Sequence, residues 1–150
     1  MNLWKDAVGI VEKAVSRVLA AEAVGRALGQ KTCDRGRIYV VAAGKAAWQV
    51  ARAASRVLSD RIEAGVVVTK YGHVKGEIPR MKCYEAGHPV PDENSFRATE
   101  AAVRLVEHLD KEDTVIFLLS GGGSALFEKP LISAEELFDV TEQLLSCGAD

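Results

Sequence analysis

The chain has 150 residues and a formal net charge of −2 at pH 7, with 48% of its residues hydrophobic and 27% charged. This length suits one domain with its own hydrophobic core, and the composition argues against a disordered or fibrous chain. The mildly acidic balance gives no electrostatic reason to expect nucleic acid as a partner, and no apolar run approaches the roughly 18 residues that a membrane span needs.

The N-terminal part is predicted to form one long helix followed by a buried strand. Apolar residues recur at steps of three and four, which predicts a single helix from about residue 3 to about residue 28, with Gly29 at its C-terminal cap. The residues of this stripe are Trp4, Val8, Val11, Val15 and Val18. Residues 38–43 are apolar without alternation, which is typical of a strand buried on both faces of a parallel sheet.

A helix and two further strands are predicted next. Residues 45–59 are rich in alanine and predict a helix that can lie close to the sheet. Residues 65–69 predict a second buried strand. Residues 81–85 form a weaker, alternating pattern that is typical of a strand nearer an edge.

The last third of the chain predicts a helix, a strand and a helix. Asp92 is the expected N-cap of the first helix. The inner face of that helix is expected to be Phe96, Thr99, Val103, Val106 and Leu109. Residues 114–119 give the strongest strand pattern in the chain, and Ser133 with Glu136 has the spacing of a capping box that starts a last helix reaching about Cys147.

The resulting order, α-β-α-β-β-α-β-α, predicts an α/β fold. We expect a doubly wound, mostly parallel sheet with helices on both faces, Rossmann-like in its arrangement, in one N-terminal domain over residues 1–150. A sheet with so few strands would keep a thinly covered edge. We therefore also expect the sequence to be a truncated part of a longer chain.

The cysteines and the N-terminus predict a cytoplasmic protein. The three cysteines are Cys33, Cys83 and Cys147, and no two of them have the Cys-x-x-Cys spacing of a zinc or redox site. An odd number of scattered thiols favours reduced, packed side chains. The N-terminus shows no secretory signal.

Ligands of open parallel sheets bind outside the carboxyl ends of the strands. Four segments of this sequence directly follow predicted strands: residues 42–47, 69–75, 86–95 and 120–125. Parallel strands would place all four segments on one rim of the sheet, so their polar groups are the candidates for a site.

The run from Ser120 to Ser124 contains three consecutive glycines after the strongest strand. Such a run lets backbone N–H groups converge on an anion, and both serines can add hydroxyl donors, so we predict a phosphate-binding loop. The alternative is a flexible connection. A nucleophilic serine is disfavoured, because the Gly-x-Ser-x-Gly elbow needs glycine where Leu126 stands.

Lys45 follows Gly44 at the expected start of a helix. The segment is not a Walker A loop, and it is a near miss to the dinucleotide-binding Gly-x-Gly-x-x-Ala pattern. The acidic residue that this pattern needs at the end of the next strand is absent, since Thr69 and Lys70 stand there. A lysine at a helix start adds positive charge to an end that already attracts anions, so we expect Lys45 in the site, with a solvated surface lysine as the alternative.

The two remaining rim segments carry cations and histidines. Residues 69–75 contain two lysines and His73, which can bind a carboxylate or a phosphate or can form an ordinary polar loop. Residues 86–92 are stiffened by two prolines, which suits a pre-organised site, although Asp92 already has a sufficient role as N-cap. His108 lies near the end of a helix, where we expect a structural role.

Four motifs in this order along the chain carry a family resemblance. They are Ala42-Ala43-Gly44-Lys45-Ala46-Ala47, Val67-Val68-Thr69-Lys70-Tyr71-Gly72-His73, Gly87-His88-Pro89-Val90-Pro91-Asp92 and Leu119-Ser120-Gly121-Gly122-Gly123-Ser124-Ala125-Leu126. Together they resemble the N-terminal domain of the bacterial and archaeal two-domain glycerate 2-kinases, over nearly the whole chain.

The resemblance implies phosphorylation of D-glycerate at its 2-hydroxyl group by ATP, giving 2-phosphoglycerate, with Mg²⁺ or another divalent cation. It implies that Lys45 is the catalytic lysine, and it assigns no metal ligands. The implied cofactor-binding residues are Gly44, Ser120, Gly121, Gly122, Gly123 and Ser124. The implied substrate-binding residues are Lys70, His88 and Asp92.

Members of that family are longer, with a second, C-terminal α/β domain across the active-site cleft. The resemblance therefore implies that this chain carries only part of the site, is inactive alone and has its missing C-terminal domain as a partner. A homodimer is a further candidate assembly. Two alternative functions stay open: an NAD(P)-dependent hydroxypyruvate reductase, a name that some members have carried, and a non-catalytic ligand-binding module.

Overall fold

The computed structural model describes residues 2–29, 35–123 and 125–148. Within them a four-stranded sheet has the order β3-β2-β1-β4, and its neighbouring strands are all parallel. The strands are β1 (Ile38–Ala43), β2 (Ile62–Lys70), β3 (Met81–Ala86) and β4 (Thr114–Leu119). The predicted parallel sheet is confirmed, and β2 is longer at both ends than the strand predicted over residues 65–69.

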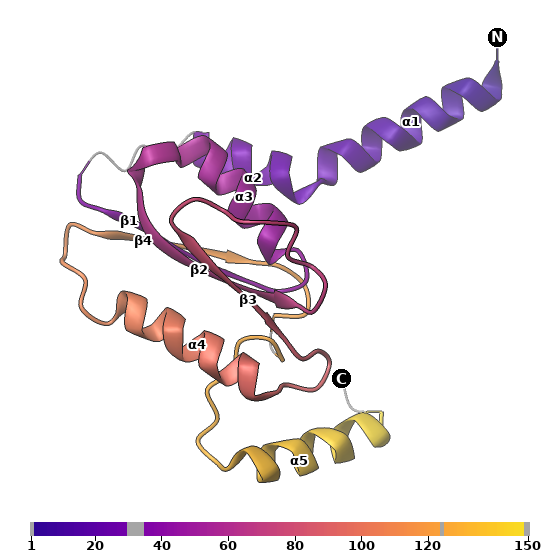
Figure 1. Cartoon of the computed structure of the whole chain (residues 1–150). Helices are drawn as coiled ribbons and strands as arrows, with labels where there is room; N and C mark the ends of the chain where they lie inside the picture. Colours follow the sequence, from indigo (N-terminus) through magenta and orange to yellow (C-terminus); the bar gives the residue numbers. More distant parts are fainter. Residues whose placement is uncertain (1, 30–34, 124, 149–150) are drawn as a thin grey trace.

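Helices cover both faces of this sheet (Figure 1). On one face, α3 (Ala47–Leu58) packs its alanines against Ala42 and Val67, and α2 (Ala20–Gly29) packs on α3 through Val24. On the other face, α4 (Glu93–Val106) packs against β1 and β2. The predicted doubly wound α/β arrangement is therefore confirmed.

The single N-terminal helix predicted over residues 3–28 is wrong. The chain forms α1 (Leu3–Val18) and α2, separated at Leu19, whose ψ of 131° is extended. The packing of α2 on α3 overrides the continuous periodicity, while α1 runs away from the sheet (Figure 1). Four residues of its apolar stripe, Trp4, Val8, Val11 and Val15, are exposed in consequence, with Trp4 78% exposed.

The inner face predicted for α4 is correct only in part. Thr99 is buried as expected, but the other buried residues are the small Ser95, Ala98 and Ala102, and Val103 is exposed. Small side chains let the helix lie close to the sheet. Phe96 instead stacks on Phe138 of α5 (Ala134–Ser146), with ring centroids 6.3 Å apart.

The N-cap signals at Asp92 and Ser133 are confirmed. Asp92 caps α4 and Ser133 caps α5, each in a reciprocal capping box with the residue three positions on. A short 3₁₀ turn, η1 (Ser59–Arg61), joins α3 to β2. No helix in the described part of the chain is both long and apolar enough to cross a membrane.

The two edges of the sheet differ. β3 is an edge strand, as its alternating sequence predicted. β4 is the other edge despite its strongly apolar sequence, and its Phe117 is 50% exposed on the face that α4 covers elsewhere. A thinly covered edge is thus present at β4, the strand that leads into the glycine run.

Candidate functional site

The loops after β1 and β4 are bonded to each other at the carboxyl ends of the strands. The N–H of Lys45 donates to the carbonyl of Gly121 at 3.1 Å, and the N–H of Ser120 donates to the carbonyl of Ala43 at 2.9 Å. The Ser120 hydroxyl accepts from the N–H of Ala46 at 3.0 Å and donates to the Ala43 carbonyl at 3.3 Å. The predicted convergence of these two motifs on one rim is therefore what the structure shows.

Gly44 makes this close approach of the two loops feasible. Its φ is +116°, a conformation that glycine alone adopts readily, and an added Cβ would overlap the backbone and hydroxyl oxygens of Ser120. Gly44 therefore packs directly against Ser120. Its place in the structure is at the junction of the two loops.

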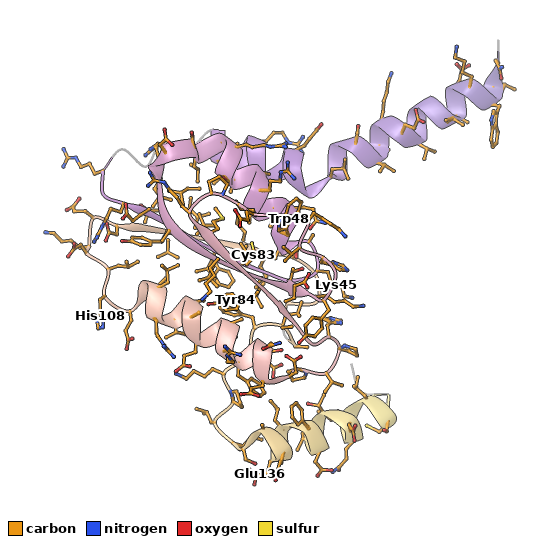
Figure 2. All side chains as sticks on the ribbon, in the orientation of Figure 1. Lys45, Trp48, Cys83, Tyr84, His108 and Glu136 are labelled. Carbon is orange, nitrogen blue, oxygen red and sulfur yellow. The ribbon has the colours of Figure 1, made fainter. Side chains whose placement is uncertain are left out.

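Lys45, His88 and Gly122 lie together on the same rim. An added Cβ at Gly122 would lie 2.6 Å from Nε2 of His88 and 2.9 Å from Cε of Lys45. Gly122 has a φ of +77°, so the bend turns through the left-handed region at the point where it meets these two side chains. Figure 2 shows Lys45 at the end of the sheet opposite His108.

Two lysines act on the imidazole of His88. Partial burial lowers the pKa of His88 below its ordinary 6.5, and the positive charges of Lys45 and Lys70 lower it further. Lys70 ends β2, whereas Lys45 follows β1. The rim therefore combines two ammonium groups with an imidazole that is neutral at pH 7, which is an environment that attracts anions.

The end of β2 and the loop after it hold the backbone of Lys45. Nδ1 of His73 lies 2.8 Å from the Lys45 carbonyl oxygen, and the hydroxyl of Thr69 donates to the same oxygen at 3.2 Å. Glu85 of β3 holds the loop in turn, accepting from the N–H of Val74 at 2.8 Å. That bond, joined by those from the N–H groups of Gly72 and His73, lowers the pKa of Glu85 below 4.5 against the opposing effect of burial.

Asp92 anchors the segment that carries His88. Its Oδ1 accepts from the N–H of Ser95 at 3.0 Å, and its Oδ2 accepts from the hydroxyl of Tyr71 at 2.6 Å. Burial raises the pKa of Asp92, but hydrogen bonds from Tyr71, Gly87 and Ser95 outweigh it, and the net pKa is below 3.8. The bond to Asp92 raises the pKa of the Tyr71 hydroxyl above 10.0. The carboxylate of Asp92 thus links the loops after β2 and β3.

Two expectations about the anion-binding groups need correction. The helix predicted to start at Lys45 starts at Ala47, and the N–H groups of Lys45 and Ala46 already donate to the glycine bend. The hydroxyl of Ser120 likewise serves the join between the loops. The positive charge at this rim comes from lysine side chains more than from a helix end. Ser124 lies outside the described residues.

Sequence reasoning singled out residues 69–75 as a candidate binding segment but did not predict the supporting bonds that residues of β2, β3 and the loop between them make. Thr69 and His73 hold the Lys45 backbone, and Tyr71 and Glu85 fix the neighbouring loops. The available signal was the position of these residues at or just after the ends of predicted strands. The particular bonds depend on the strand register, which pairs Lys70 with Ala86 and brings these loops side by side.

The other candidate groups lie apart from this rim. His108 lies at the far end of the sheet (Figure 2), and a hollow of about 640 Å³ lined by residues 74 and 76–83 lies beside β3. Burial raises the pKa of the Cys83 thiol, Cys147 is exposed, and Cys33 lies outside the described residues. No three His, Cys, Asp or Glu side chains within residues 2–29, 35–123 and 125–148 gather so as to hold a metal ion.

Comparison with known proteins finds one matching family and several proteins of similar sequence. Residues 6–150 match the family described as "Domain of unknown function (DUF4147)". The D-glycerate 2-kinase of Thermotoga maritima is 50% identical over 150 residues, which are 99% of this chain and 36% of that protein. A protein of Agrobacterium vitis named as a hydroxypyruvate reductase is 41% identical over 119 residues, which cover 77% of this chain and 26% of the relative.

The fold also matches the solved structure of a similar protein. The crystal structure of glycerate kinase from Thermotoga maritima superimposes with a TM-score of 0.89 at 49% identity, over 99% of this chain and 36% of that one. The chain thus spans little more than a third of the length of this relative. The chain belongs to the DUF4147 family, and its resemblance to the N-terminal domain of the glycerate 2-kinases is confirmed.

Proposed function

We propose that this chain carries part of the active site of a cytoplasmic, ATP-dependent kinase that phosphorylates the 2-hydroxyl group of D-glycerate to give 2-phosphoglycerate. The observation that carries the proposal is the approach of Lys45 to Gly122 at the carboxyl ends of parallel strands. The names of the relatives from Thermotoga maritima and Agrobacterium vitis fit an enzyme acting on a three-carbon hydroxy or oxo acid.

The geometry suits phosphoryl transfer. That reaction asks a protein mainly to position the reactants and to stabilise the charge on the transferred group. In the proposal, the ammonium group of Lys45 supplies the charge, and the bend of residues 120–123 lets phosphate oxygens approach because Gly122 has no side chain beside Lys45. Lys70 adds a second cation to which the carboxylate of glycerate can bind.

ATP and a divalent cation fit the site to different degrees. The polyphosphate of ATP fits two ammonium groups on the rim that carries the glycine bend, and Gly44 with Ser120–Gly123 would line it. A protein-held cation does not fit the described residues, since no three suitable ligands gather there. We therefore assign Mg²⁺, where it accompanies ATP, to phosphate oxygens and water.

The proposal assigns the chain only part of the site. The chain spans 36% of the length of its Thermotoga maritima relative, and the remaining length has room for a second domain facing the rim. Groups of that domain would complete the charge around the transferred phosphoryl group. The homodimer and the inactivity of the isolated chain remain predictions.

The test is a coupled assay of ATP consumption by the full-length protein that contains this chain. We expect consumption of ATP only when D-glycerate is present. Lys45→Met should lower kcat/KM by roughly 10³-fold or more, because it removes a charge that acts on the transferred group. The matched control is Lys111→Met, because Lys111 is exposed and lies before β4, at the opposite end of the sheet.

The second candidate is a hydroxypyruvate reductase, which the name of the Agrobacterium vitis relative favours. The sequence at the end of β2 counts against it, because a dinucleotide site needs an acidic residue where Thr69 and Lys70 stand. Mixing the protein with hydroxypyruvate and NADH or NADPH decides between the two. Oxidation of the cofactor without any glycerate-dependent consumption of ATP would reverse our order.

A further inference from the structure

The proposed reaction releases a proton from the hydroxyl group of the substrate, so the site needs a group that can accept it. Two carboxylates near the rim, Asp92 and Glu85, already accept hydrogen bonds from Tyr71 and Ser95 and from the N–H of Val74. Nδ1 of His73 is bonded to the carbonyl of Lys45, which leaves Nε2 of His73 with a lone pair. None of the three atoms nearest to the place of a side chain at Gly122 belongs to His73.

His88 has the required position. Its Nε2 is the atom nearest to the place that a side chain at Gly122 would occupy, at 2.6 Å, and Cε of Lys45 is next at 2.9 Å. An atom bound between the glycine bend and the Lys45 ammonium group would therefore lie beside Nε2. His88 is held there by a segment that Asp92 ties to both Tyr71 and the start of α4.

The geometry also indicates which ring nitrogen of His88 can accept a proton. Nε2 is the ring nitrogen that faces Gly122. The neutral ring carries one N–H, and in the tautomer with that N–H on Nδ1 the lone pair of Nε2 is directed at the bend.

We propose that His88 is the catalytic base of the phosphoryl transfer, with Nε2 as the atom that takes the proton from the substrate hydroxyl. This inference rests on the proposed kinase function and adds a role to it. The hydroxyl oxygen forms a bond to the γ-phosphorus of the nucleoside triphosphate, and the bond from that phosphorus to the bridging oxygen breaks. The bridging oxygen leaves with the electron pair as part of the nucleoside diphosphate, and the proton on Nε2 then passes to water.

The charges around His88 suit a base that becomes stronger when substrates bind. Partial burial lowers the pKa of the ring, and the positive charges of Lys45, which follows β1, and of Lys70, which ends β2, lower it further while the site holds no anion. A bound triphosphate offsets both ammonium charges and so raises the affinity of Nε2 for a proton. The base therefore gains strength at the point in the cycle where the hydroxyl must lose its proton.

The experiment compares His88→Gln and His88→Ala with wild type in the full-length protein. Loss of a general base should lower kcat by about 10²-fold or more, while KM for ATP and for glycerate changes by less than about 3-fold. Added imidazole should restore part of the turnover of His88→Ala and none of that of His88→Gln, in which the side chain fills the space. The control is His108→Gln, which removes an imidazole at the far end of the sheet (Figure 2).

A titration that needs no variant gives an independent check. The ring of His88, followed by NMR in the wild-type protein, should titrate below pH 6.5 and should shift upward on addition of inorganic tripolyphosphate. A ring that titrates at its ordinary pKa and ignores tripolyphosphate contradicts the proposal. So does a His88→Gln enzyme with near-wild-type kcat, or a kcat loss in His88→Ala that imidazole does not relieve.

These outcomes are distinguishable from failure of the proposed function itself. Wild type that consumes no ATP with glycerate refutes the kinase function. Wild type that is active, together with an equally active His88→Gln variant, refutes only the role of His88. Thermal unfolding of each variant establishes that the compared proteins are folded.

Discussion

Nδ1 of His73 is bonded to the backbone carbonyl of Lys45 at 2.8 Å, so a side chain of the loop after β2 sets the position of the residue that follows Gly44. A carbonyl oxygen can only accept, so Nδ1 carries the proton in this bond. The Thr69 hydroxyl donates to the same oxygen. The backbone of Lys45 is thereby fixed from β2 on one side and from the glycine bend on the other.

We expect His73→Ala to weaken the proposed reaction by loosening Lys45. A hydrogen bond of this kind contributes about 1 kcal/mol, which corresponds to roughly 5-fold in kcat/KM for ATP. His73→Asn should recover much of the loss, because its amide N–H can donate from nearly the place of Nδ1. Steady-state kinetics of the full-length variants measures both, and equal activity in His73→Ala and wild type would contradict the positioning role.

Gly122 should tolerate no side chain, whereas its neighbour Gly121 should. An added Cβ at Gly122 would lie 2.6 Å from His88 and 2.9 Å from Lys45, at a φ of +77°, whereas an added Cβ at Gly121 meets nothing within 4 Å. We expect Gly122→Ala to lower nucleotide affinity and kcat together by about 10²-fold, since a misplacement of about 1 Å has that effect on a positioned reaction. Gly121→Ala should remain within about 3-fold of wild type.

The measurement for this pair is kinetics with isothermal titration of ATP on both variants. The two substitutions add the same methyl group one residue apart, so a general effect of losing glycine in the loop would appear in both. Equal losses in the two variants would show that flexibility of the run, rather than space beside Lys45 and His88, matters.

The sequence predicts the sheet and its rim well because those depend on local patterns. The strand patterns at residues 38–43 and 114–119 became β1 and β4 with those bounds, and the capping boxes fixed the starts of α4 and α5. Parallel pairing then places the carboxyl ends of all four strands on the same rim of the sheet. Proximity of Lys45 to the glycine bend follows from these features alone.

The features that the sequence could not predict depend on packing between distant elements. The break at Leu19 has no glycine or proline to mark it, and it arises where α2 packs on α3. The inner face of α4 consists of small residues because the helix lies close to the sheet, which periodicity in large apolar residues does not indicate. The bonds of His73 and Tyr71 require the register of β2 against β3.

The stability of the protein should fall in acid because of Asp113, which lies at the amino-terminal ends of the strands. Its carboxylate, only 3% exposed, accepts from the side chain of Arg37 at 2.7 Å and from the backbone N–H of Arg37 at 2.9 Å. These bonds hold the pKa of Asp113 far below its ordinary 3.8, whereas in the unfolded chain the group titrates near that value. The unfolded state therefore binds more protons, and stability falls as the pH falls below about 4.

The test of this pair is urea unfolding of wild type and Asp113→Asn between about pH 7 and pH 2. Wild type should be more stable at neutral pH, and the difference in free energy of unfolding should shrink as acid protonates the unfolded Asp113. Asp110→Asn is the control, because Asp110 also bonds Arg37 but is 81% exposed. A difference that stays constant over this pH range would contradict the assignment.

Gly44 should be the glycine of the site whose substitution damages the fold most. Its φ of +116° lies outside the region that L side chains readily adopt, and an added Cβ would overlap the backbone of Ser120, which cannot move without breaking the bonds between the loops after β1 and β4. We expect Gly44→Ala to lower the free energy of unfolding by about 3 kcal/mol or more. Gly72→Ala is the matched control, because Gly72 has a φ of +76° with nothing within 4 Å of its added Cβ, and should lose about 1 kcal/mol from backbone strain alone. Urea unfolding measures the free energy of unfolding of both variants. Equal losses would mean that the close contact with Ser120 adds nothing to the backbone strain. The two loops would then be held together by their hydrogen bonds.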